Sequence, residues 1–284
     1  MEVNVVKIFE DEDYRKVKKL CDDHEGWNLV YEKKHNRVWT KPADEGDLLM
    51  FKARTVFSDV SADIAYDVLQ DPQYRTKWDR YMINTIDIGI LNPNNDICYY
   101  SREFYSYQFF LCIDIFFFEV GAFPPIRSRD FVMQRSWLDT GSEKYICGHS
   151  VCHDDFPPKN SFIRGTIYLT AYFVKALGPN ACEITYLTHS DPKGKLPTWL
   201  INRVTKVVAP KALKKLHKAS INYPSWKNKH NPNWKPWLYP DQLLNAPRID
   251  QAQCRPRNDY AQTIVDESNI KASDVKESDD NEDD

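Results

Sequence analysis

The chain has 284 residues, a formal net charge of -3 and an apolar content of 42%, which is enough for one large domain or two small ones. It contains only 9 glycines, and neither a G-x-G-x-x-G sequence nor a G-K-[ST] sequence occurs. Both observations argue against a nucleotide-binding protein with a Gly-rich phosphate loop.

The start of the chain predicts a leading segment followed by a helix. After the N-terminal segment, residues 1–10, the sequence 11–27 has the apolar spacing of a short helix, with Asp11 as its N-cap and Gly26 as its end. Its buried face is expected to consist of Tyr14, Val17, Leu20 and Cys21. No basic stretch followed by an apolar one occurs at the start, so we expect no secretory signal.

Strands are expected next. Residues 28–41 predict a hairpin with a turn at His35 and Asn36, and residues 48–57 predict a further strand, because apolar and β-branched residues alternate there between turn-forming residues.

Two short helices separate these strands from a long run of others. The helices are expected at residues 61–71 and from Pro72 to Asp79. From Thr85 to Tyr186 the sequence is rich in short β-branched and aromatic runs separated by turns, which predicts several antiparallel strands.

A long helix over residues 196–220 is expected to follow, and the domain is expected to end near Tyr223. Pro197 suits the first turn of this helix, whereas Pro210 is expected to kink it near Lys206. Its apolar face is expected to consist of Leu200, Val204, Val207, Val208 and Leu216. The element order predicts an α+β fold, in which one long helix lies across a curved antiparallel sheet.

Four stretches carry a resemblance to a known family. They are QYRTKWD after a short helix, SRDFV at the start of a strand, YLTHSDPKGKLPTWLIN before the last helix, and APKALKKLHKA within it. Together they resemble the StAR-related lipid transfer (START) family over roughly Asp11 to Pro240. The resemblance implies a helix-grip fold, in which the sheet encloses a hydrophobic lipid tunnel and the C-terminal helix is its lid. It also implies that this domain, residues 11–223, binds one glycerophospholipid and carries it between membranes, and is no enzyme.

The resemblance also suggests roles for individual residues. Arg75 matches the arginine of the family that meets the lipid phosphate, a group whose burial needs a fixed cation. From the residues alone, Arg75 can equally be a surface arginine paired with Asp71 or Asp79. Tyr168 matches an aromatic residue that packs on the choline group, and Thr170 matches a polar residue near the headgroup.

Two positions depart from the choline-specific pattern of the family. Ser101 stands where choline-specific members have Trp, and Phe131 stands where they have Tyr. A quaternary ammonium depends on aromatic faces because it has no N–H, whereas a primary ammonium can donate hydrogen bonds to Ser101 or Thr170. We therefore expect phosphatidylethanolamine to be accepted as well as phosphatidylcholine.

Charge is distributed unevenly along the second half of the chain. Residues 192–240 contain eleven Lys or Arg and no acid, whereas residues 266–284 contain nine acids and two Lys. Because much of the basic stretch lies on the expected lid helix, we expect it to contact anionic membranes and not nucleic acid. The expected membrane-docking residues are Lys206, Lys211, Lys214, Lys215 and Lys218.

Two segments are expected after the domain. Residues 224–262 form an extension rich in Pro and Trp, and residues 263–284 form an acidic tail that is expected to be disordered, because it has too few apolar residues to form a core. Ser273 and Ser278 lie among acids, as acid-directed kinases prefer, so both are candidate phosphorylation sites or else plain solvated serines.

The most unusual stretch of the chain is residues 104–121, which contain six Phe and have no counterpart in the family. A transmembrane helix needs ~20 apolar residues, and Gln108, Asp114 and Glu119 interrupt this stretch, so no membrane span is expected. The composition favours an extended hairpin or a disordered loop between two strands, which if exposed would dock on membranes or be prone to aggregation. A translated unspliced intron remains as the alternative.

Cysteine and histidine residues give little support for a metal site. His149 and His153 lie beside Cys147 and Cys152, but their segment predicts a strand, in which residues four apart lie more than ~12 Å from each other. We therefore expect no metal and no cofactor. The seven cysteines lack a disulfide-framework spacing, which predicts free thiols in a reducing compartment such as the cytoplasm. With the family resemblance, we expect a monomer that associates peripherally with membranes.

Two alternatives to a lipid carrier stay open. The bound lipid can regulate a protein partner instead of being transported, or the domain can belong to an acyl-thioester hydrolase. No attached catalytic domain and no G-x-S-x-G sequence occur, so the hydrolase has little support.

Overall fold

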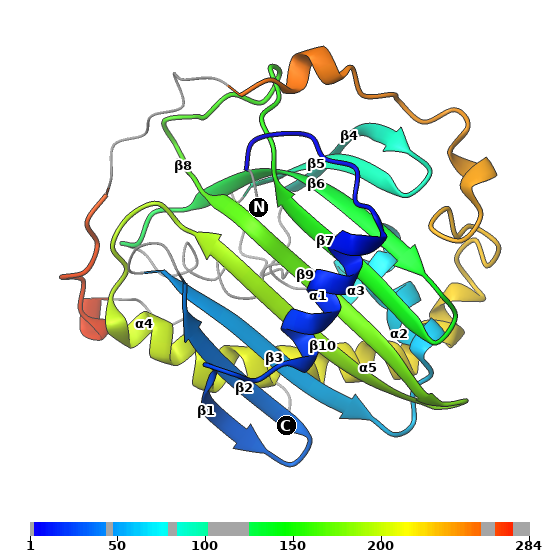
Figure 1. Ribbon diagram of the computed structural model, residues 1–284, viewed down its shortest axis with the longest axis horizontal. Coiled ribbons are helices and arrows are strands. Elements are labelled where there is room, and N and C mark those ends of the chain that lie inside the picture. Colours follow the sequence, from blue (N-terminus) through cyan, green and yellow to red (C-terminus); the bar gives the residue numbers. More distant parts are fainter. Residues whose placement is uncertain (1–2, 44–47, 79–83, 102–124, 257–264, 275–284) are drawn as a thin grey trace.

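The structure, a computed structural model, describes residues 3–43, 48–78, 84–101, 125–256 and 265–274, and a curved antiparallel sheet forms its centre (Figure 1). The strands are β1 Asn28–Lys33, β2 Asn36–Pro42, β3 Leu49–Phe57, β4 Asn84–Asn92, β5 Asn95–Ser101, β6 Arg129–Asp139, β7 Glu143–Ser150, β8 Ile163–Arg164, β9 Thr166–Gly178 and β10 Ala181–Asp191. Their order across the sheet is β1-β2-β3-β10-β9-β7-β6-β5-β4, and β8 pairs in parallel with β6.

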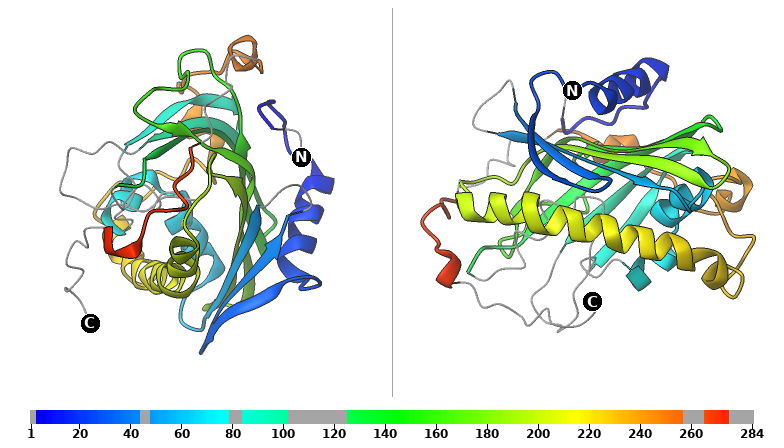
Figure 2. Two further views of the ribbon diagram at one scale, coloured as in Figure 1. Left: turned by 90° about the vertical axis from the view of Figure 1, so that its left-hand side faces the viewer. Right: turned by 90° about the horizontal axis from the view of Figure 1, so that it is seen from below.

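Helices cover both faces of this sheet (Figure 2). They are α1 Asp11–Asp22, α2 Ala62–Gln70, α3 Pro72–Trp78, α4 Thr198–Arg203, a π-helical turn Val204–Val208, and α5 Ala209–Lys227, with 3-10 helices at Pro240–Leu243, Gln251–Cys254 and Ala272–Asp274. The outer face of the sheet is the one that α1 covers, and the inner face is the one that α2, α3 and α5 cover. This arrangement confirms the expected α+β helix-grip architecture.

The two faces have separate apolar cores because side chains alternate between them along each strand. The inner core joins the sheet to α2, α3 and α5, and includes Phe51, Tyr100, Phe131, Tyr172 and Tyr186. The outer core joins the sheet to α1, and includes Tyr14, Val17, Cys21, Phe173 and Leu187. These alternating faces determine which strand residues face the long helix.

The first helix differs slightly from expectation at both ends. Its N-cap is Glu10 and not Asp11, and the Glu10 N–H donates to the carboxylate of Asp13 at 3.1 Å. The helix ends at Asp22, before Gly26, whose φ of 73° serves the following turn. Three expected face residues are buried, namely Tyr14, Val17 and Cys21, and Leu20 is half-buried.

The first hairpin turns one residue earlier than expected. Lys34 and His35 form the turn, and Lys33 pairs with Asn36. Lys34 has a φ of 55°, in the left-handed region that tight two-residue turns require.

The long C-terminal helix is interrupted near Lys206, as expected, but by a π-helical turn. Pro210 lies in the first turn of α5 and has no N–H to donate to the preceding turn, so the backbone widens there. The wider turn rotates Val207 outward to 43% exposure, so its expected burial is wrong. The other four residues of the expected apolar face are buried. The helix continues past Tyr223 to Lys227.

The segments after the helix pack on the domain. Trp237 is buried at 7% exposure, and Ile90 of β4 forms a parallel bridge with Arg248. The tail also departs from expectation, because its described part, residues 265–274, is ordered and contributes the buried Glu267. Composition alone predicted disorder there, but Glu267 pairs with the buried Arg129, which is distant in the sequence.

Candidate functional site

Arg75 lies on α3, inside the fold and not at its surface. Asp71 precedes this helix and accepts backbone hydrogen bonds from Gln73 at 3.0 Å and Tyr74 at 3.2 Å, which fixes the first turn. Arg75 is 4% exposed, and its Nη1 donates to the carbonyl oxygen of Leu69 at 3.2 Å. The reading of Arg75 as a surface arginine is therefore wrong, and a buried guanidinium lies on the inner side of the sheet.

Two other expected site residues share this side. Phe131 of β6 is fully buried in the inner core, opposite Tyr100 of β5. Gly165 makes room for it, since a Cβ at that position would lie 2.2 Å from the Phe131 ring. Thr170 is 1% exposed, and its hydroxyl lies 3.4 Å from that of Tyr186, a member of the same core.

The structure puts Tyr168 on the opposite, outer face. A β-bulge between β9 and β10 pairs Leu169 with His189 and Ile167 with Ser190, which leaves Tyr168 as the extra residue. The Tyr168 ring stacks on His189 with centroids 4.6 Å apart. Because His189 follows the outer-face alternation of β10, Tyr168 is not brought together with Arg75.

Ser101 also faces away from the inner core. Its side chain hydrogen bonds to that of Tyr99, whose hydroxyl donates to the Asp130 carboxylate at 3.1 Å. Arg164 donates to both oxygens of that carboxylate at 2.9 Å. Alternation along β5 turns Ser101 and Tyr99 to one face and Tyr100 to the other. The roles expected for Ser101 and Tyr168 beside the headgroup therefore lack support from their positions.

Sequence reasoning missed an aromatic pair on the inner face. Tyr172 and Tyr186 have ring centroids 4.8 Å apart, next to Thr170. The signal was available in the period-two alternation, because both residues share the register of Thr170 across the β9–β10 ladder.

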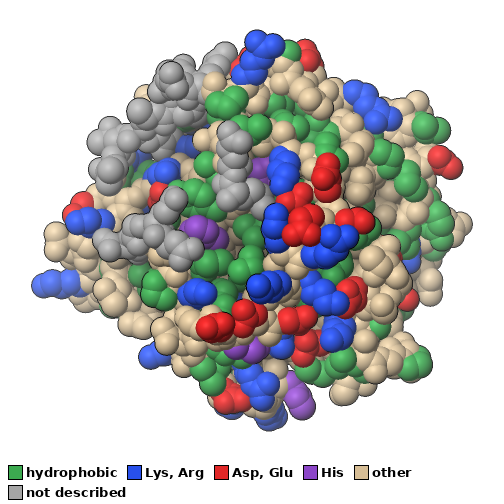
Figure 3. Space-filling model, in the orientation of Figure 1, with side chains coloured by type: hydrophobic (Ala, Val, Ile, Leu, Met, Phe, Trp, Pro, Cys, Tyr) green, Lys and Arg blue, Asp and Glu red, His purple; other side chains and the backbone are tan. Residues whose placement is uncertain are grey.

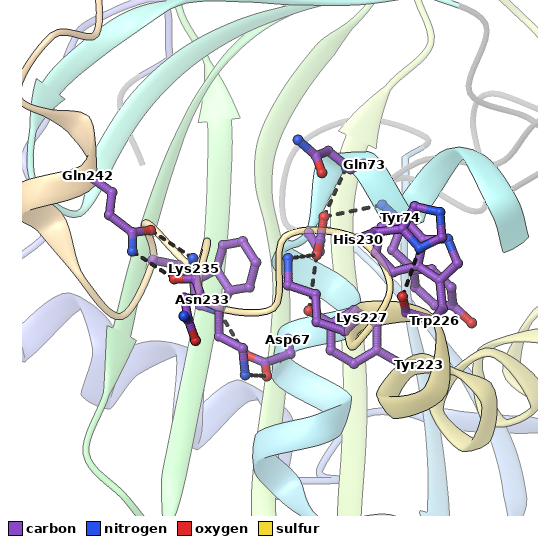
Figure 4. Close-up of polar contacts among 12 residues, drawn as sticks. Asp67, Gln73, Tyr74, Tyr223, Trp226, Lys227, His230, Asn233, Lys235 and Gln242 are labelled. Atoms are coloured by element: carbon purple, nitrogen blue, oxygen red, sulfur yellow. Dashed lines mark hydrogen bonds and ion pairs between the residues drawn. The ribbon is translucent and has the colours of Figure 1, made fainter.

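A buried ion pair fixes the C-terminal end of α5 to the start of α3 (Figure 4). The Lys227 ammonium lies 2.7 Å from the Asp71 carboxylate, and Tyr223 donates to the same oxygen at 3.0 Å. Lys227 is also within 6 Å of three indole rings, a geometry that favours a cation. Burial, with the nearby carboxylates, raises the pKa of Tyr223, so it remains a hydrogen-bond donor.

A second buried carboxylate ties the extension to α2. Asp67 accepts hydrogen bonds from Lys235 at 2.5 Å and from the Trp237 indole at 2.7 Å. Burial raises the pKa of Asp67, although both donors oppose the shift. Asp67 and Asp71, with Lys227 and Lys235, are called the clamp below, because they join the end of the helix and the extension to the α2–α3 corner.

The solvent side of the long helix is basic. Four of the expected membrane-docking residues are exposed, Lys206, Lys211, Lys214 and Lys218, and Lys215 is half-buried. Val207 and Ile221 are exposed among them, at 43% and 48%. The α1 side of the molecule differs, because acidic and basic side chains are interspersed there (Figure 3).

Within the described ranges, no helix is long and apolar enough to cross a membrane, and no group of three or more His, Cys, Asp or Glu side chains could share a metal ion. His149 is fully buried in β7, where its Nε2 lies 3.1 Å from the carbonyl oxygen of Val5. The stretch 104–121 and Ser278 lie outside the described residues, while Ser273 is exposed.

Comparison with known proteins identifies relatives along most of the chain. The family model described as START domain matches residues 7–109 and 117–227, so only residues 110–116 of the expected insert 104–121 lie outside the match, and the insert is shorter than expected. START domain-containing protein 10 of Mus musculus is 40% identical over 238 residues, covering 84% of this chain and 76% of the relative. Phosphatidylcholine transfer protein of Bos taurus is 26% identical over 203 residues, covering 69% and 85%. The crystal structure of human STARD10 aligns with a TM-score of 0.76 at 36% identity, covering 89% of this chain and 96% of that one.

Proposed function

The chain belongs to the START domain family, and from that premise we propose that it binds one glycerophospholipid between its sheet and its long C-terminal helix and transfers it between membranes. The ligand is phosphatidylcholine, phosphatidylethanolamine or both. One relative is named for phosphatidylcholine transfer, and the long helix, α4 to α5, is the lid. No catalytic step is part of this function.

The observation that carries the proposal is the buried guanidinium of Arg75 beside an aromatic inner core. A lipid phosphate can leave water only if a fixed cation meets it, because an uncompensated buried charge costs several kcal/mol. Arginine suits this task because its planar fork can bind two phosphate oxygens at once. The surrounding apolar side chains suit acyl chains.

The headgroup amine has different partners in this proposal from those that the family resemblance implied. Thr170 and the ring pair of Tyr172 and Tyr186 lie on the inner face, so they are our candidates, with Phe131. Hydroxyl groups accept hydrogen bonds from a primary ammonium and aromatic rings attract a quaternary one, which supports acceptance of both headgroups.

Native mass spectrometry of the purified protein, together with transfer of labelled phospholipid between vesicles, tests this function. We expect one phospholipid per chain and faster transfer of phosphatidylcholine and phosphatidylethanolamine than of a labelled sterol. Lipid binding without transfer would instead support the lipid-gated regulator. A chain that extracts no phospholipid from either vesicle type would contradict the proposal.

We further propose that the lid helix is the surface that meets membranes. Its exposed lysines attract anionic headgroups, at ~1 kcal/mol per charge near the surface, and Val207 and Ile221 can enter the interface. The free, buried state of the six described cysteines fits a reducing compartment, so we propose a cytoplasmic monomer with transient membrane contact and no nucleic-acid partner.

Removing the charges of the lid should weaken membrane binding without changing the fold. Gln at Lys206, Lys211, Lys214 and Lys218 is expected to reduce binding to vesicles with 30% anionic lipid at least tenfold at low salt, and less at high salt. Sedimentation with vesicles measures this effect. The matched control changes the exposed Lys16, Lys19, Lys33 and Lys34 to Gln. An equal loss in the control would show that only net charge matters.

Phosphorylation is proposed for the acidic tail. Ser273 is exposed and its hydroxyl donates to Asp274 at 3.2 Å, so a kinase can reach it. Ser278 remains a candidate from its acidic sequence context. Each phosphate would add about -1.5 to -2 charge to the tail, which would oppose docking to an anionic membrane.

A further inference from the structure

The described part of the acidic tail binds a preformed site near the start of the lid. We call residues 265–274 the strap. Glu267 of the strap lies 2.7 Å from the Arg129 guanidinium, and their side chains are 5% and 0% exposed. The other carboxylate oxygen of Glu267 accepts the Arg127 N–H at 2.8 Å. A carboxylate and a guanidinium buried together are strongly coupled, since either one alone would be an uncompensated charge.

Backbone contacts hold the strap in register on the turn before α4. Lys195 donates to the carbonyl oxygen of Val265 at 3.0 Å, and Glu267 donates to the Lys195 carbonyl at 2.9 Å. Gly194 permits this close approach, because a Cβ there would lie 2.2 Å from the Val265 oxygen. The site therefore binds the strap through its backbone at Val265 and Glu267 as well as through the Glu267 side chain.

The strap also reaches the lid itself. The Trp199 indole of α4 donates to the carbonyl oxygen of Ile270 at 2.7 Å, and Ile270 packs against the inner core. The strap lies beside α4 in Figure 1, at the end of the long helix opposite the clamp. One short segment thus joins the start of β6, the turn at 192–197 and α4.

The two ends of the lid are held by different kinds of attachment. At the C-terminal end, the clamp joins α5 to the α2–α3 corner through Lys227, the last residue of the helix, and through Lys235, eight residues further on. At the N-terminal end, α4 is held by a segment that lies about 70 residues further along the chain, as the Trp199–Ile270 bond shows. The π-helical turn lies between the two attachments.

We propose that the strap is a latch on the α4 end of the lid. Bound, it holds α4 against the fold; released, it frees α4 to move and uncovers Arg129, which lies near the already exposed Arg127 and Lys195. Arg129 would then be accessible to anionic lipid headgroups, which compete with Glu267 for it. The proposal rests on the lid role in the proposed function, and the partner of the site is the strap of the same chain.

Hydrogen–deuterium exchange of the α4 amides tests the latch without any lipid. Glu267→Gln keeps an acceptor for the Arg127 N–H but removes the charge that pairs with Arg129. We expect exchange in residues 198–203 to become about tenfold faster, the effect of losing one charge-assisted hydrogen bond. The matched control, Glu282→Gln, removes the same charge from the tail outside the strap and should exchange like the wild type.

A second variant distinguishes loosening of α4 from a general loss of folding. Trp199→Phe removes the indole donor and leaves no buried charge unpaired, so it should also loosen α4 while the melting temperature changes little. Unchanged exchange in 198–203 for both Glu267→Gln and Trp199→Phe would overturn the latch. Equal acceleration in Glu282→Gln would also overturn it, because tail charge alone would then explain the result.

Transfer measurements connect the latch with lipid release. Glu267→Gln should raise the initial transfer rate to anionic vesicles severalfold and leave the amount of bound lipid per chain unchanged. If the wild type transfers no lipid, the proposed function fails while the exchange result still reports on the strap. If exchange accelerates and transfer stays at the wild-type rate, the strap binds α4 but is no latch, and the proposal fails.

Discussion

Replacing Arg75 with Ala is expected to lower phospholipid binding at least tenfold while the domain remains folded. Arg75 is 4% exposed, on the inner side of the sheet, where we propose that it meets the lipid phosphate. A charge-assisted hydrogen bond is worth ~1.5–3 kcal/mol, and a tenfold change in binding corresponds to ~1.4 kcal/mol. A phosphate left without its cation would add a further penalty.

The measurement is the fraction of lipid-bound protein in native mass spectra after incubation with phosphatidylcholine vesicles. Lys77→Ala is the matched control, because it removes an exposed cation from the same helix. Arg75→Lys separates charge from shape, since lysine keeps the charge but not the planar fork, and should bind at an intermediate level. Wild-type lipid occupancy in a folded Arg75→Ala protein would remove Arg75 from the site.

Much of the fold follows from local sequence patterns. The strands were predictable because alternation and turn residues are local features, and residues such as Phe131 and Thr170 fell on the inner face by that alternation. The position of the helix interruption was predictable as well, since Pro210 must disturb the preceding turn. Its form, a π-helical turn that exposes Val207, was not, because proline allows several ways to lose a hydrogen bond.

The headgroup site was only partly predictable. Matching a residue to a family position says nothing about a bulge, and one extra residue is enough to turn Tyr168 to the outer face. Ser101 shows the same sensitivity, since it neighbours the inward Tyr100 yet points the other way. The pair of Tyr172 and Tyr186 could have been found from the period-two alternation, which is regular on β9 from Leu169 to Ala176.

Contacts between distant residues were beyond any pattern in the sequence. Glu267 lies 138 positions from Arg129, and Lys227 lies 156 positions from Asp71. Composition assigned Glu267 to a disordered tail, and Lys227 fell in the expected Pro- and Trp-rich extension, after the expected end of the helix. Each of them is buried beside a buried residue of opposite charge that is distant in the sequence.

The clamp gives the largest stability prediction. Lys227→Met is expected to lower the free energy of unfolding by ~3–5 kcal/mol, because it leaves the Asp71 carboxylate buried without a cation. Lys227 is 4% exposed and Asp71 is fully buried, with 2.7 Å between Nζ and the carboxylate oxygen. Urea unfolding followed by circular dichroism measures the change. Lys229→Met, at an exposed lysine two residues further on, should stay within ~0.5 kcal/mol of the wild type.

A second substitution at the partner separates the loss of a contact from the cost of a stranded charge. In Asp71→Asn with Lys227→Met neither charge remains, so the double variant should be more stable than Lys227→Met alone, although the amide can satisfy fewer donors than the carboxylate. In the wild type, the Tyr223 hydroxyl and the backbone N–H groups of Gln73 and Tyr74 donate to the Asp71 carboxylate. If the double variant is the less stable one, these three donors matter more than Lys227, and the clamp depends on hydrogen bonds to Asp71 instead of on the ion pair. In either case the attachment at this end of the lid is internal to the fold, so salt should weaken it far less than it weakens membrane binding by the exposed lysines.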